Sequence, residues 1–319
     1  MSELLEALEL HPVRIPMRHP FRRVDHREAV LIKGPEGWGE FSPFPDYPPQ
    51  VTARWLASAL ESACSPLPSP VRERIPVNVT VPVVPPETAA ALVRESGAST
   101  AKVKVGDPGT TIDEDEERLD AVVDALGPGG RIRIDVNAVW TLEEATKALE
   151  HLSRFDFEYV EQPVATIAEM VELRRRVGVR LAADELIRLS PNPLEVTEQG
   201  ACDVVIVKVQ PMGGVARVMS LINRIDLPVV VSSALETSVG IYGGLLVASL
   251  IDDLPYACGL ATVSLLQGDP TPHPLVSVDG FLDVRRVEPE RVQLMRWAPD
   301  RELATEMMRR LRSAAELLT

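Results

Sequence analysis

Residues 100–106 read Thr-Ala-Lys-Val-Lys-Val-Gly, and this short run guides the interpretation of the whole chain. Side chains alternate along a β-strand, so Val103 and Val105 face one side while Lys102 and Lys104 face the other. If the valines pack against helices, both lysines point to the opposite face of the sheet. A solvated edge strand is the alternative explanation of the same pattern.

Similar β-branched runs recur at regular intervals after this segment, and one precedes it. They are eight in number: residues 76–84, 100–106, 131–138, 157–163, 180–185, 203–210, 228–234 and 257–262. Apolar residues at helical spacing separate them, which implies crossover connections and a parallel sheet. Eight such units predict a (β/α) barrel, although an open doubly wound sheet would give a similar pattern.

The first 75 residues follow another pattern. Two strand-like runs, 28–32 and 38–42, flank a turn rich in glycine and proline, which predicts a hairpin, and a helical pattern covers residues 49–63. Strand-like residues return at 275–285, and a helix is expected over 300–318. We therefore expect an α+β capping domain at 1–75, a (β/α) barrel at 76–274, and a C-terminal segment at 275–319 that packs with the capping domain.

Composition excludes several classes of protein. The formal net charge of −14 argues against nucleic-acid binding, which needs a basic surface to neutralise phosphates. The longest apolar stretch is too short to cross a bilayer, and the acidic N-terminus lacks the basic region of a secretory signal. The three cysteines are odd in number and widely spaced, which argues against a disulfide framework. We expect a cytoplasmic, monomeric protein with a small-molecule partner.

Carboxylates end three successive runs of the predicted barrel. Asp135 and Asn137 close the third strand on one side, Glu161 closes the fourth, and Asp184 closes the fifth. Each carboxylate alone is explained equally well as a helix cap or a first-turn charge. Three at neighbouring strand ends would converge and repel, and a hard divalent cation such as Mg²⁺ or Mn²⁺ would resolve that conflict.

A third lysine, Lys208, ends the apolar sixth run, across the predicted barrel from Lys102 and Lys104. It either extends to solvent from a strand end or belongs to the site. A metal flanked by lysines on opposite faces suits proton abstraction next to a carboxylate. The metal would stabilise the second negative charge, and a lysine of lowered pKa would take the proton.

These residues, in this order, resemble the enolase superfamily and, within it, the branch similar to muconate-lactonizing enzyme. The resemblance covers nearly the whole chain and is carried by Lys102-Val103-Lys104, Asp135-Val136-Asn137, Glu161-Gln162-Pro163, Ala183-Asp184-Glu185 and Lys208. It implies that Asp135, Glu161 and Asp184 are metal ligands, that Lys104 is the base, and that Lys102 lies near the substrate carboxylate. Asp184 is preferred to Glu185, which would project to the opposite side of its strand.

Finer features resemble the o-succinylbenzoate synthase family of menaquinone biosynthesis. They are residues 17–21 with 37–45, the Gly213-Gly214 pair, and the segment 232–240 that follows the seventh strand. The resemblance implies dehydration of 2-succinyl-6-hydroxy-2,4-cyclohexadiene-1-carboxylate, a dicarboxylate, to o-succinylbenzoate. Lys104 would remove the proton α to the metal-bound carboxylate, and Lys208 would remain cationic over the ring face.

Further residues are predicted to bind the substrate. Ser232 and Ser233, with a helix starting near Thr237, would offer hydroxyl and backbone donors to the succinyl carboxylate, or they simply begin a loop. Gly259 would leave room for the substrate or merely relieve packing. The segment 14–23 is expected to be a loop over the barrel mouth, with Arg18, His19 and Arg22 as candidate contacts, and an ordinary solvated loop is the alternative.

Three other functions fit part of the pattern. An N-succinylamino acid racemase would use Lys104 and Lys208 as bases on opposite faces of the α-carbon. A class I aldolase would form a Schiff base on Lys208 but would leave the three carboxylates without a role. A non-catalytic binding protein on an inherited barrel should have lost at least one of these residues, yet all are present.

Overall fold

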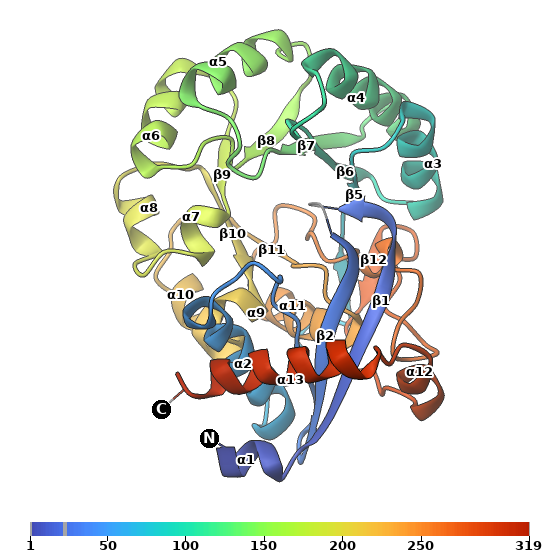
Figure 1. The fold of residues 1–319 in the computed structure, drawn as a ribbon. Coiled ribbons are helices and arrows are strands. Elements are labelled where there is room, and N and C mark those ends of the chain that lie inside the picture. The colour runs from blue at the N-terminus through green and yellow to red at the C-terminus, as the bar shows by residue number, and fades with distance from the viewer. Residues whose placement is uncertain (1, 22–23, 319) are drawn as a thin grey trace.

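The computed structural model describes residues 2–21 and 24–318, and most of these residues form a (β/α) barrel (Figure 1). Within the described residues, seven parallel strands lie in the order β11-β10-β9-β8-β7-β6-β5. Their bounds are β5 Val79–Val81, β6 Thr100–Lys104, β7 Arg131–Asp135, β8 Phe157–Glu161, β9 Leu181–Ala183, β10 Val204–Lys208 and β11 Val229–Ser232. Seven of the eight predicted strands are therefore confirmed, each shorter than expected.

The eighth predicted run, 257–262, is not a regular strand, yet it closes the ring. Cys258 bridges Val77 and Gly259 bridges Ser232, in each case parallel, so this segment joins the two edges of the sheet. Backbone bonds from Cys258 N to Pro76 O and from Gly259 N to Val231 O measure 2.8 and 2.9 Å. The pairing is too short to count as a strand, but the barrel is closed there.

Helices surround the strands, as the apolar spacing predicted (Figure 1). Three of them, α4, α5 and α6, begin with a Thr-x-x-Glu capping box, in which Thr111, Thr141 and Thr166 are the N-caps. The barrel helices are α3 Pro86–Ser96, α4 Ile112–Leu126, α5 Leu142–His151, α6 Ile167–Arg176, α7 Glu185–Arg188, α8 Leu194–Glu198, α9 Val209–Met212, α10 Val215–Ile222 and α11 Ser238–Leu250, with a 3₁₀ turn η1 at Val263–Leu265.

The N-terminal part forms a sheet and a helix beside the barrel. It comprises α1 Ser2–Glu6, β1 Glu9–Phe21, β2 Val24–Gly34, β3 Gly37–Phe41 and α2 Pro49–Cys64. The predicted hairpin is confirmed, because β2 and β3 pair antiparallel with Gly34 opposite Gly37. The expected loop at 14–23 is wrong over residues 14–21, which belong to β1, and Arg22 lies outside the described residues. Alternation of polar and apolar residues in β1 was the missed signal.

The C-terminal part returns to both regions. Strand β12 Phe281–Asp283 pairs antiparallel with β4 Arg74–Pro76, just before the barrel. After α12 Arg291–Arg296, helix α13 Arg301–Ala315 lies across α2 and β2, and both termini lie on the same side (Figure 1). The strand-like run at 275–285 thus contains only a short strand, and the helix expected at 300–318 is close to its observed bounds. The domain boundaries themselves stay a prediction.

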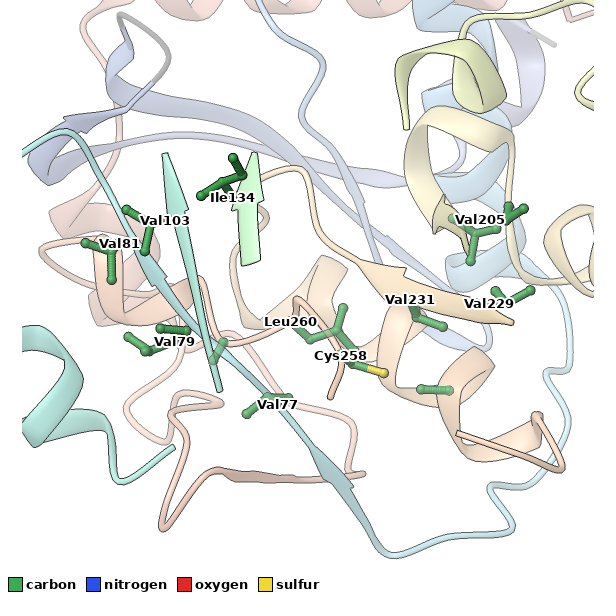
Figure 2. Packing of buried hydrophobic residues seen from close by; sticks show 14 of the residues in the cluster. Val77, Val79, Val81, Val103, Ile134, Val205, Val229, Val231, Cys258 and Leu260 are labelled. Atoms are coloured by element: carbon green, nitrogen blue, oxygen red, sulfur yellow. The ribbon is translucent and has the colours of Figure 1, made fainter. Parts of the chain in front are cut away.

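The core lies between the strands and their helices. Val81 and Val103 are paired neighbours on β5 and β6, and Figure 2 shows them side by side in this layer, with Val77 close to Cys258. Because these valines face the helices, Lys102 and Lys104 point into the barrel. Cys64, Cys202 and Cys258 are free thiols. Across the described part of the chain, no helix is long and apolar enough to span a bilayer.

Candidate active site

Charged side chains occupy the carboxyl ends of five neighbouring strands, from β6 to β10. Two lysines come from β6, one carboxylate each from β7, β8 and the residue after β9, and one lysine from β10. They are Lys102, Lys104, Asp135, Glu161, Asp184 and Lys208, and all are buried. The register sets Lys104 opposite Asp135 and Asp135 opposite Glu161. The structure thus brings together the charged residues that the sequence singled out, while their roles remain predictions.

Each of the three carboxylates is paired with a lysine. Lys102 Nζ donates to both carboxylate oxygens of Glu161 at 2.9 Å. Lys104 Nζ donates to Asp135 Oδ2 at 2.5 Å, and Lys208 Nζ donates to Asp184 Oδ2 at 2.6 Å. Two of these pairs are in contact with each other, because Lys102 Nζ also lies 3.3 Å from Asp135 Oδ2. Four of the groups are thus joined by direct contacts, and Lys208 and Asp184 act on them electrostatically, so the six form one buried network of charges.

The network shifts the pKa values of its carboxyls in different directions. Burial favours the protonated form of Asp135, but the two lysines of β6 outweigh it and hold its pKa well below the usual range. Burial also opposes the ionisation of Asp184, yet Lys208 and Arg188 lower its pKa to about 2. Burial and repulsion from Asp135 raise the pKa of Glu161 to about 7. The three lysines balance the formal charge of the three carboxylates, and burial is the main cause that favours a proton on Glu161.

Two residues to which the sequence analysis gave no role position Asp184. Gln162 Oε1 accepts hydrogen bonds from the backbone N–H groups of Asp184 and Leu186 at 3.0 and 3.2 Å. Arg188 Nε donates to Asp184 Oδ1 at 3.1 Å, and a terminal nitrogen of Arg188 donates to Glu185 Oε1 at 2.7 Å. The place of Gln162 directly after Glu161 was a usable signal. Arg188, a lone arginine beyond a strand end, gave no such signal in the sequence.

Asn137 and Glu185 extend this network at the mouth of the barrel. Asn137 adopts a left-handed backbone conformation with φ at 53°, accepts from Lys104 Nζ, and donates to Glu185 Oε1 at 3.3 Å. The expectation that Glu185 points away from the site is therefore wrong. The strand ends at Ala183 and Glu185 begins α7, so strand alternation no longer sets its direction.

A cavity of about 30 Å³ lies among these side chains. Its wall includes the predicted contacts Ser232, Ser233 and Gly259. It also includes residues that the sequence analysis missed: Phe21, Phe44, Thr80, Ala234, Leu235 and Thr262. The volume is about that of one water molecule, which is smaller than a dicarboxylate substrate needs. Phe21 lies beside the lysine of this wall, since Lys104 Nζ is 5.2 Å from its ring centroid.

The backbone donors predicted at the start of α11 are already engaged. Thr237 N and Gly240 N donate to Glu40 Oε2 at 3.1 and 3.0 Å, and Ser238 N donates to Asp269 Oδ2 at 2.9 Å. That expectation is wrong, because carboxylates from β3 and from the segment after η1 occupy the helix terminus. The hydroxyl groups of the two serines before the helix also have partners, since Ser232 Oγ donates to Gly259 O at 3.3 Å and Ser233 Oγ forms a hydrogen bond with Thr262 Oγ1 at 2.8 Å. Their contact with the substrate stays a prediction.

Arg18 is not among the residues that line the small cavity. It is exposed and lines a separate cavity of about 580 Å³, whereas its neighbour Met17 is buried and bridges Leu266. Alternation along β1 turns the two side chains to opposite faces, which explains why Arg18 points away. The predicted contact between Arg18 and the substrate therefore gains no support from its position.

The residues of the network fit a hard divalent cation. Three buried carboxylates at adjacent strand ends supply only oxygen donors, which Mg²⁺ and Mn²⁺ prefer. Among the described residues, the group of potential ligands whose atoms all lie within 4.8 Å of one another is a different one: Asp113, Glu116 and His151, on the outer helices α4 and α5. Glu116 there already accepts hydrogen bonds from His151 and Arg154, so that group is explained as a surface ion-pair cluster.

Family models match most of the chain. The model described as enolase C-terminal domain-like matches residues 86–289, and the model described as enolase N-terminal domain-like matches residues 13–63. Among solved structures, muconate lactonizing enzyme from Pseudomonas fluorescens superposes with a TM-score of 0.77 at 18% identity, covering 92% of this chain and 98% of that one. At this identity the likeness shows the fold alone.

Curated relatives are closer in sequence. An o-succinylbenzoate synthase from Thermobifida fusca is 52% identical over 86% of this chain and 86% of its own length. Another from Mycobacterium marinum is 47% identical over 94% of this chain and 91% of its own length. The chain therefore belongs to the enolase superfamily and, within it, to the o-succinylbenzoate synthase family.

Proposed function

We propose that this protein dehydrates 2-succinyl-6-hydroxy-2,4-cyclohexadiene-1-carboxylate to o-succinylbenzoate. The observation that carries the proposal is the order of charged groups across neighbouring strand ends: lysines on β6, carboxylates on β7, β8 and after β9, and a lysine on β10. Proton abstraction next to a carboxylate needs a base on one side and positive charge around the carboxylate. This arrangement supplies both in one buried site.

Members of the enolase superfamily use a divalent metal ion, and we infer that Mg²⁺ is the ion here. Asp135, Glu161 and Asp184 would hold it, with the three lysines beside them. When bound, the ion supplies a Lewis acid that stabilises added negative charge on the substrate carboxylate. The oxygens of these three buried carboxylates are the hard donors that this ion prefers.

The lysines divide the work of the reaction. Lys104, held by Asp135 and Asn137, removes the proton α to the carboxylate and then protonates the leaving hydroxyl group, which departs as water. Lys208 stays cationic and stabilises the dienolate electrostatically from across the barrel. Lys102 and the hydroxyl groups of Ser232 and Ser233 bind the two carboxylates of the substrate. Formation of the aromatic ring drives the step.

The first test follows turnover of the cyclohexadiene carboxylate by the ultraviolet loss of the diene. Wild-type protein with Mg²⁺ should turn it over, and a chelator should abolish the reaction. Lys104→Ala should lower kcat by at least about 100-fold, because general acid–base catalysis contributes that much. Lys147→Ala is the matched control, since Lys147 is exposed on α5. Absence of turnover by folded, metal-loaded wild-type protein would exclude the proposal.

A second activity, racemisation of N-succinylamino acids, is favoured by the same pair of lysines. Lys104 on β6 and Lys208 on β10 both line the cavity, and three strands lie between β6 and β10. Racemisation requires such an arrangement, with one base on each face of the α-carbon. Deuterium exchange at the α-carbon in heavy water measures it directly. Loss of exchange from one enantiomer in Lys104→Ala, and from the other in Lys208→Ala, is the expected result. Equal exchange in both variants would argue against it.

A further inference from the structure

A third cavity, of about 290 Å³, lies between α2, α7, α8 and α10. Figure 1 shows α2 beside α10, with α7 and α8 on the neighbouring side of the barrel. Arginines dominate its polar wall, with Arg54 from α2, Arg217 from α10, Arg224 just beyond α10, and Arg188 from α7. In a chain of formal net charge −14, four arginines around one small cavity form a local exception.

Three of these arginines lack a counter-charge. Arg188 is buried and paired with Asp184 and Glu185, but among the described residues Arg54, Arg217 and Arg224 form no ion pair. Burial lowers the pKa of Arg54, and repulsion from Arg217 lowers it further. An anion that entered the cavity would therefore meet guanidinium groups that no carboxylate already pairs.

The acidic residue of α2 does not supply that charge. Glu61 accepts hydrogen bonds from the backbone N–H groups of Val215 and Ala216, at 2.5 and 2.9 Å, and so caps α10. Helix α10 itself contains no acidic residue. Arg54 donates to backbone carbonyl groups of Arg188 and Ser190 at 3.2 and 3.5 Å, which leaves further N–H groups of its guanidinium available for a ligand.

Apart from Asn192 and Ser220, the rest of the wall is apolar. Ile187, Leu194 and Met212 are buried, and Leu221 of α10 adds a further aliphatic surface. Inorganic phosphate would match the arginines but would leave this surface without contacts. A carboxylate attached to a ring or a short chain would satisfy both parts of the wall, and the volume is close to that of small-ligand pockets.

We propose that this cavity binds a small organic carboxylate with an apolar body, and that Arg188 links the bound anion to Asp184 in the active site. Arg188 lines the cavity, accepts from Arg54 through its carbonyl group, and holds Asp184 Oδ1 through its side chain. A ligand at this position would therefore change the electrostatic surroundings of Arg188, which is bonded to Asp184 in the active site. The site is separate from the substrate cavity and does not depend on the proposed reaction.

Calorimetric titration with benzoate tests the site. Arg217 and Arg224 are exposed, so the double variant Arg217→Gln/Arg224→Gln should fold normally, and Arg291→Gln on α12 removes an exposed arginine elsewhere. The double variant should lose a binding component or weaken it at least about tenfold, because charge-assisted hydrogen bonds contribute strongly. The control variant should bind benzoate as the wild type does. Any binding of benzoate in the catalytic cavity should be the same in all three proteins.

Identical isotherms for the wild type and the double variant would overturn the site. Saturable binding of inorganic phosphate without binding of benzoate would overturn the ligand class. For the link through Arg188, the measurement is the Mg²⁺ affinity with and without benzoate. The change should be at least about fivefold in the wild type and smaller in the double variant. Equal changes in the two proteins would overturn the link.

Discussion

Gly259 lies where the ring of strands closes, between β11 and the start of β5. Ser233 N donates to its carbonyl group at 3.0 Å, and Ser232 Oγ donates to the same oxygen at 3.3 Å. A Cβ atom at Gly259 would lie 2.5 Å from Ser232 Oγ and 3.2 Å from Ser232 Cβ. The space beside Gly259 is therefore occupied by a serine that lines the active site, rather than left open for the substrate.

Gly259→Ala should lower the free energy of unfolding by about 1–3 kcal/mol, because it overfills this contact. Ser232→Ala removes the nearest atom, so the double variant should recover part of the loss. A coupling of about 0.5–3 kcal/mol between the two sites is expected for residues in contact. Urea unfolding of the four proteins measures it. Strictly additive losses would show that the hydroxyl group is not what excludes a side chain at Gly259.

Helix α11 shows how one element is held in place by distant segments. It is apolar and largely buried, so its first N–H groups need partners inside the protein. Thr237 Oγ1 accepts from Val239 N, and the carboxylates of Glu40 and Asp269 accept from the other N–H groups of the first turn. Negative charge at this end also interacts favourably with the positive end of the helix dipole.

Asp269→Asn should destabilise the protein by about 1–3 kcal/mol, because both of its oxygens face N–H donors and an amide offers only one oxygen. Glu302→Gln is the control, since Glu302 is an exposed acid in the first turn of α13. Its effect should stay below about 0.5 kcal/mol. Urea unfolding at pH 8 compares the two variants, and equal losses would contradict the role of Asp269.

At the scale of the whole molecule, buried charges join the N-terminal part to the barrel. Arg27 on β2 donates to the carbonyl groups of Ala234 and Leu235, which lie directly after β11. Glu40 and Glu236 are buried near it, and Arg27 lowers the pKa of both carboxyls only partly. Burial, and then repulsion from Glu40, raises the pKa of Glu236 to about 7.

This raised pKa predicts a pH dependence of stability. The folded protein keeps a proton on Glu236 that the unfolded chain releases near pH 4.5. The stabilising contribution is therefore fully present below about pH 4.5 and is lost as the pH rises through about 7. Glu236→Gln should make the fall in unfolding free energy between pH 5 and pH 8 shallower, whereas Glu302→Gln should not. Urea unfolding across this range measures both, and parallel curves would contradict the assignment.

The sequence by itself determined the barrel and the charged residues of its mouth. Alternation in Lys102-Val103-Lys104 depends only on neighbouring residues, and parallel strands bring their carboxyl ends to one edge. Asp135, Glu161, Asp184 and Lys208 could therefore be placed near the two lysines before any tertiary contact was known. The hairpin and the last helix followed from equally local patterns, a turn and an apolar spacing.

Only the tertiary structure decided which groups complete and surround this site. Arg27 contacts Leu235 across 208 positions of sequence, and Glu40 reaches Thr237 across 197, so no local pattern could show that α11 was already capped. Periodicity reports which face a residue occupies, whereas the partner on that face depends on how distant segments pack.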